Sequence, residues 1–122
     1  MDTSQIDELI ARCSSDIPTT EIFSSIFDTL HHEEFCDAFS RRVAHEYLAG
    51  RLTYASADQA MNCLDTFCHH STERGMPEYS WDVYLAFDEG EYLHPGDPDE
   101  VDPVAKYTRP AVQEIVARDN AE

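Results

Sequence analysis

Apolar residues recur every three or four positions along most of the chain, and this spacing constrains the fold more than any other feature. In the segment 32–49, four apolar residues stand four apart: Phe35, Phe39, Val43 and Tyr47. Residues with that spacing share one face of an α-helix, whereas a half-buried strand alternates in twos. No segment alternates convincingly, so the sequence predicts an all-α fold.

The same spacing predicts helices over 3–14, 19–30, 32–49, 56–72, 77–87 and 108–117. Ser56 and Gln59 match a capping box at the start of the fourth helix, and Gly90 is expected to end the fifth. Asp102 and Pro103 resemble an N-cap followed by proline at the first helical position. Since 122 residues is the size of one domain, we expect residues 1–122 to form a single-domain antiparallel bundle of five or six helices. An acidic Pro/Gly loop, 93–103, lies near its C-terminal end.

Charge is the strongest indication of function. The chain has 25 Asp and Glu against 8 Lys and Arg, a formal net charge of −17, beyond the magnitude of about 2–8 that keeps a small domain soluble. Such a field repels nucleic acids and anionic membranes and attracts basic proteins. We therefore expect a basic protein as partner, and neither a nucleic acid nor a membrane. Without a signal-like start or a long apolar run, cytoplasmic localisation is expected.

The segment 78–102 concentrates this character. It holds nine carboxylates, no Lys or Arg, and the single tryptophan of the chain, Trp81. Trp and Tyr are enriched at binding hot spots, where carboxylates meet Lys and Arg of a partner. The alternative is that Trp81 and Tyr84 belong to the core, with their polar tips at its edge. The candidate partner-binding residues are Tyr79, Trp81, Asp82, Tyr84, Asp88, Glu89, Glu91, Tyr92, Asp97, Asp99 and Asp102.

A metal site is the sharpest competing hypothesis. Cys63, Cys68, His69 and His70 lie within eight residues, but on a helix Cys63 and Cys68 point about 140° apart and do not easily share one ion. His32 and Cys36 share a helix face at i, i+4. We expect the cysteines to be reduced core thiols and expect no metal, although the sequence leaves open whether the Cys63–His70 cluster ever binds one.

Catalytic chemistry has little support in the sequence. The acids of the loop 93–103 do not follow the EF-hand order for calcium. There is no nucleophile elbow, phosphate-binding loop or paired-histidine helix motif. We therefore expect no enzymatic activity and no cofactor.

The run 81–110, WDVYLAFDEGEYLHPGDPDEVDPVAKYTRP, resembles a C-terminal pattern of small acidic bacterial immunity proteins and covers about a quarter of the chain. The colicin nuclease immunity proteins are similar in kind, being small, helical and acidic, with tyrosines and carboxylates at the toxin face. The resemblance implies an acidic, aromatic surface that docks on a cognate basic toxin, such as a nuclease, and plugs or blocks its active site. The alternative is an acidic helical adaptor, or a DNA-mimic regulator, that binds a basic protein.

Overall fold

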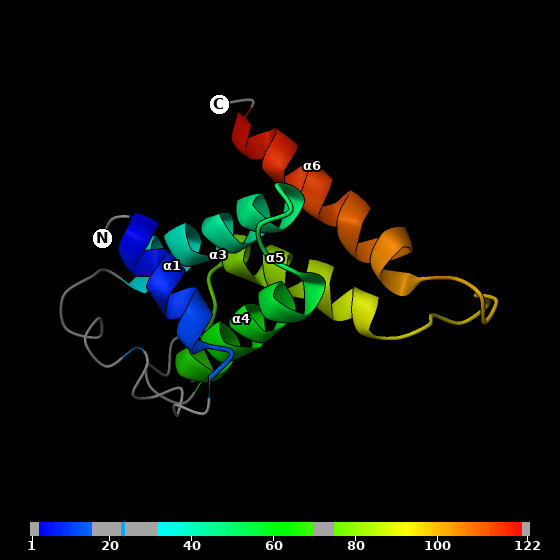
Figure 1. The fold of residues 1–122 in the computed structure, drawn as a ribbon, viewed down its shortest axis with the longest axis horizontal. Coiled ribbons are helices and arrows are strands. Elements are labelled where there is room, and N and C mark those ends of the chain that lie inside the picture. The colour runs from blue at the N-terminus through cyan, green and yellow to red at the C-terminus, as the bar shows by residue number, and fades with distance from the viewer. Residues whose placement is uncertain (1–2, 16–22, 24–31, 70–74, 121–122) are drawn as a thin grey trace.

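Helix α3 (His32–Leu48) is the element around which the others pack. The helices α1 (Thr3–Arg12), α4 (Tyr54–Phe67), α5 (Glu78–Asp88) and α6 (Arg109–Asn120) all contact it (Figure 1). The computed structural model describes residues 3–15, 23, 32–69 and 75–120. Within these ranges the chain is all-helical and has no strand, which confirms the expected all-α bundle.

The core follows the predicted apolar stripe of α3. Phe39 and Val43 are fully buried, and Phe35 nearly so. Phe23 packs on this stripe, with its ring centroid 5.6 Å from that of Phe39 and 4.8 Å from that of Phe67. Each such side chain contributes about 1.5–3 kcal/mol through burial. Apart from Phe23, the predicted helix 19–30 lies outside the described residues.

Helix α4 begins earlier than the capping box predicted. Its N-cap is Thr53, whose Oγ1 accepts a hydrogen bond from the backbone N–H of Ser56 at 3.1 Å. Ser56 already lies in the first turn, so its prediction as the N-cap is wrong. The earlier start places Tyr54 where its hydroxyl donates to the Phe87 carbonyl at 2.7 Å, a contact with α5 that sequence spacing does not reveal.

Gly90 was predicted to end the fifth helix, but the helical path continues through it. The chain continues from α5 into a 3₁₀ turn, η2 (Glu89–Glu91), with Gly90 buried inside it. A side chain at Gly90 would overlap Oγ1 of Thr108 and lie 3.2 Å from the Tyr54 ring. Glycine is therefore required here for close packing.

The C-terminal helical segment is longer than predicted at both ends. Asp102 Oδ1 accepts from the backbone N–H of Val104 at 3.0 Å, which confirms the predicted Asp102–Pro103 start. A π-helical turn, η3 (Val104–Thr108), follows, and the Arg109 N–H donates to the Val104 carbonyl. Pro110 cannot donate to a carbonyl four residues back, and the widened turn lies just before it. The predicted helix 108–117 corresponds to α6 (Arg109–Asn120), which begins within one residue of the predicted start and ends three residues later than predicted.

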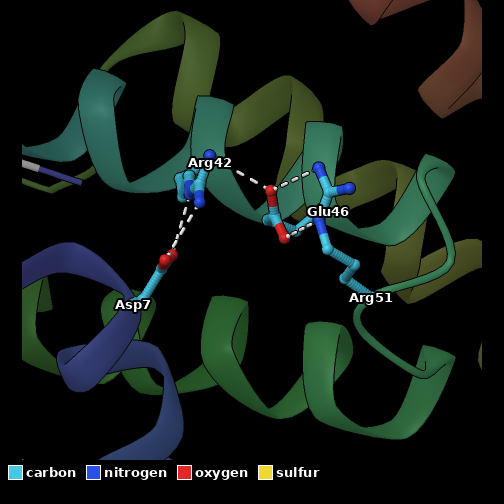
Figure 2. A network of polar contacts seen from close by, with 4 residues as sticks. All are labelled: Asp7, Arg42, Glu46 and Arg51. Carbon is cyan, nitrogen blue, oxygen red and sulfur yellow. Dashed lines mark hydrogen bonds and ion pairs between the residues drawn. The ribbon is translucent and has the colours of Figure 1, made fainter. Parts of the chain in front are cut away.

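An ion-pair network joins α1 to α3 (Figure 2). Arg42 donates to both carboxylate oxygens of Asp7, at 2.8 and 2.9 Å. The nearly buried Glu46 carboxylate accepts from Arg51 at 2.6 and 2.9 Å and lies 3.1 Å from Arg42 Nη1. The hydrogen bonds from Arg51 lower the pKa of Glu46 despite its burial. These arginines are thus engaged within the fold.

Candidate protein-binding surface

Helix α5 buries one side and exposes an aromatic pair on another. Val83 and Phe87 are fully buried, whereas Trp81 is 42% exposed. The Trp81 and Tyr84 rings stack with centroids 5.2 Å apart and an interplanar angle of 14°. Trp81 therefore lies outside the core, and Tyr84 is half-buried at its edge.

Three carboxylates from three elements meet beside this pair: Asp58 on α4, Asp88 at the end of α5 and Glu91 in η2. Partial burial, followed by hydrogen bonds with Asp58 and Asp88, raises the pKa of Glu91 to about 7. Burial and the nearby acids, these three among them, also raise the pKa of the Tyr84 hydroxyl. We call Asp58, Trp81, Tyr84, Asp88 and Glu91 the acidic–aromatic surface.

The three carboxylates of this surface have no cationic neighbour among the described residues. The arginines and the lysine that form ion pairs in the described part of the chain contact other carboxylates. These are Glu8, Asp119, Asp7, Glu46, Asp97 and Asp82. Burial and hydrogen bonds with Asp58 and Asp88 contribute most to the raised pKa of Glu91, and repulsion between the like charges adds to it. The surface therefore holds repulsion that an incoming Lys or Arg would relieve.

Two predicted interface residues serve the fold instead. The Tyr79 hydroxyl donates to Asp119 Oδ2 at 2.6 Å, and Arg41 lies over the Tyr79 ring. His45 Nε2 lies 2.9 Å from the same carboxylate oxygen, so Asp119 joins α6 to both α3 and α5. Asp102, the second of these residues, caps the C-terminal helical segment.

The loop that follows η2 is held mainly by contacts with η3. Asp97 accepts from Lys106 Nζ, from the Tyr107 hydroxyl at 2.6 Å and from the His94 backbone N–H at 3.1 Å. These bonds, that from Lys106 above all, lower the pKa of Asp97 to about 2. Tyr92 stacks on His94, and His94 stacks on Tyr107. Asp97 is therefore engaged in joining the loop to η3, and Tyr92 belongs to a separate aromatic stack.

The structure thus brings together four predicted residues and adds one that sequence reasoning missed. Trp81, Tyr84, Asp88 and Glu91 lie together, while Asp82 lies 3.8 Å from Arg118, and Glu89 and Asp99 are exposed without joining the group. Asp58 was missed because the search stayed within one continuous stretch. Its seven-residue spacing from Asp65 was the available signal, because such residues share a helix face.

A different group of side chains has the donors for a metal ion. Nitrogen of His32 and the sulfurs of Cys36 and Cys68 all lie within 4.8 Å of one another. The sequence grouped Cys68 with Cys63, but Cys63 pairs with Cys13, and a hydrogen bond between those two thiols and burial raise the pKa of Cys13. His69 is exposed and lies beside Asp65. His70 lies outside the described residues.

Comparison with known proteins identifies no relative. No protein-family model, curated protein or solved structure matches the chain. No helix in the described ranges is long and apolar enough to cross a membrane. The expectation of an immunity protein therefore rests on the sequence pattern and on the chemistry of the acidic–aromatic surface.

Proposed function

We propose that the protein binds a basic protein through the acidic–aromatic surface and neutralises it as an immunity protein neutralises a cognate toxin. One observation carries the proposal: the exposed Trp81–Tyr84 stack lies beside three carboxylates that have no cationic neighbour among the described residues. Aromatic rings provide rigid contact area, and clustered carboxylates select Lys and Arg.

The protonation of Glu91 gives the surface a specific response to a cation. With a pKa of about 7, this carboxyl is about half protonated at neutral pH. A Lys or Arg of the partner favours the ionised form and displaces the proton. Binding should therefore release a proton, and affinity should rise as pH increases from 6 to 8.

The net charge of −17 adds a long-range component. It attracts a basic partner before contact, so association should be fast at low salt and slow as salt rises. On a nuclease, whose cleft attracts phosphates, the carboxylate cluster would occupy the positions of substrate charge. Inhibition then follows from plugging the cleft or from blocking substrate beside it.

The first experiment uses the neighbouring open reading frame. That frame is expressed alone and together with this chain, and cell growth and co-purification are measured. We expect toxicity alone, rescue on co-expression and a stable complex. A neighbour that is harmless alone removes the main support for a toxin inhibitor and favours the alternative, an adaptor or DNA-mimic regulator of a basic protein.

Two variants of equal charge test the surface itself. Asp88→Lys with Glu91→Lys reverses two charges at the surface, and Glu100→Lys with Glu114→Lys makes the same change in net charge at exposed positions elsewhere. We expect the first pair to weaken binding more than tenfold beyond the second, because local complementarity adds to the general field. Equal effects of the two pairs would show that the interface lies elsewhere.

The aromatic pair is tested through the dissociation rate. Replacing Trp81 with alanine should speed dissociation about tenfold or more, as expected for a hot-spot residue. Folding should be little affected, because the side chain is 42% exposed. Leu93→Ala, which truncates another exposed apolar residue, 40% exposed, is the matched control and should leave the dissociation rate near that of the wild type.

A further inference from the structure

Three potential metal ligands converge where the start of α3 meets the end of α4. His32 and Cys36 occupy the first two turns of α3, and Cys68 follows the end of α4. The sulfurs of Cys36 and Cys68 lie 3.7 Å apart, and Nδ1 of His32 lies 4.0 Å from Cys36 Sγ. We propose that His32, Cys36 and Cys68 bind a zinc ion that fastens the start of α3 to the end of α4.

The sulfur separation fits one shared ion. Two thiolates bound at about 2.3 Å to a tetrahedral zinc ion lie about 3.8 Å apart, and a thiolate and an imidazole nitrogen lie about 3.6 Å apart. The observed 3.7 Å between the sulfurs matches the first value, and the observed 4.0 Å from Nδ1 exceeds the second by a few tenths of an ångström. Nε2 of the same ring lies 3.9 Å from that sulfur, so the two ring nitrogens are about equally far from it. The half-buried imidazole must therefore rotate to direct Nδ1 at the shared ion.

The hydrogen bonding of the imidazole sets a tautomer that suits a ligand. Its Nε2 lies 2.9 Å from the Gly75 carbonyl oxygen. A carbonyl can only accept, so Nε2 carries the hydrogen, and Nδ1 of the neutral ring has the lone pair. Histidines that bind metals commonly donate their other N–H to a backbone carbonyl, which holds the tautomer and the ring orientation.

Charge and access also favour zinc. Each thiol would lose its proton to solvent on binding, so Zn²⁺ with two thiolates forms a neutral group suited to these fully buried sulfurs. A surface hollow of about 410 Å³, lined in part by His32, Glu33 and Gly75, opens beside the imidazole. The hollow reaches the imidazole but is not lined by the two cysteines, so an ion would have to enter past the His32 ring, and water in the hollow would supply the fourth ligand.

The second cysteine pair provides an internal control. Cys13 and Cys63 are also buried and adjacent, and they too share a thiol hydrogen bond. No histidine joins that pair among the groups of potential ligands in the described residues. If buried cysteine pairs alone bound metal, both pairs would do so.

The test is a titration of the reduced, metal-free protein with Co²⁺, followed by competition with Zn²⁺. A second sample is refolded in the presence of Co²⁺, so that the ion can reach the buried sulfurs. Tetrahedral Co²⁺ with thiolate ligands gives a near-ultraviolet charge-transfer band and intense visible bands, which zinc should abolish. We expect one equivalent to bind. Cys36→Ser, Cys68→Ser and His32→Gln should each weaken binding more than tenfold, whereas Cys13→Ser and Cys63→Ser should change it less than about twofold.

Two outcomes would overturn the proposal. The first is the absence of a charge-transfer band in the wild-type protein, and the second is an equal loss of the band in the control variants. If a variant fails to fold, alkylation of the cysteines of the wild-type protein still tests the site. Zinc should slow alkylation of Cys36 and Cys68 at least tenfold relative to Cys13 and Cys63, and uniform protection or none would also refute the site. These readouts do not depend on the proposed partner.

Discussion

Removing a single buried hydroxyl should destabilise this protein, while removing two should not. Ser40 on α3 and Ser80 on α5 are both fully buried, and the Ser40 hydroxyl donates to the Ser80 oxygen at 2.8 Å. Alanine at either position leaves the other hydroxyl in an apolar interface without this partner. An unsatisfied buried polar group costs about 1–3 kcal/mol. Replacing both removes the need for a partner and creates two small voids.

We expect each single alanine variant to lose about 1.5 kcal/mol and the double variant less than about 0.5 kcal/mol, a coupling of about 2.5 kcal/mol. With a urea m-value of about 1.5 kcal/mol/M, each single variant should unfold about 1 M earlier than the wild type at unchanged m. Urea titration followed by far-ultraviolet circular dichroism measures this. Neutral single variants would show that the remaining serine finds a carbonyl in its own helix, and additive losses would show that the two hydroxyls do not act as a pair. Either result refutes the reasoning.

Three further predictions follow from contacts described above. Gly90→Ala should lower stability by about 1–3 kcal/mol in the same urea assay, because the new methyl group overlaps the buried Thr108 side chain. Glu91→Gln should raise the thermal midpoint at pH 8 but hardly at pH 5. The folded pKa of Glu91, about 7, exceeds its usual 4.5, so the folded state binds more protons and its stability falls as pH rises through this window. Because Glu91 is exposed, the gain in folding stability from this substitution should stay below about 1 kcal/mol. Asp119→Ala should cost about 1–3 kcal/mol by removing an acceptor shared by α3 and α5, while Asn120→Ala, at an exposed neighbour, should not.

The sequence predicted the helices wherever an apolar stripe was long. The stripe of α3 defined its bounds to within one residue, and α5 was predicted equally well. The errors lie where two local signals compete. Thr53 and Ser56 are both good N-caps, and Asp102 before Pro103 competed with Pro110 as the start of the last helix. Contacts distant in sequence decided each case, so local patterns alone were insufficient.

The candidate site was predictable only in part, for a related reason. Its aromatic pair and two of its acids lie within 81–91, where composition was conspicuous. Asp58 lies on another helix, and the only local signal for it is its seven-residue spacing from Asp65. Conversely, Asp97 and Tyr79 are as acidic or aromatic as their neighbours, yet the fold engages them with Lys106 and Asp119. Composition identifies a region, whereas only packing distinguishes residues that face a partner from those that hold the chain together.

The position of Trp81 makes its intrinsic fluorescence a probe of partner binding. Its indole is the single one in the chain, lies 42% exposed against Tyr84 and dominates the intrinsic fluorescence. Emission should therefore change little when the core melts, since the ring is already partly in water. It should shift to shorter wavelength when a partner covers it. The same signal thus reports complex formation without any label and distinguishes binding from unfolding.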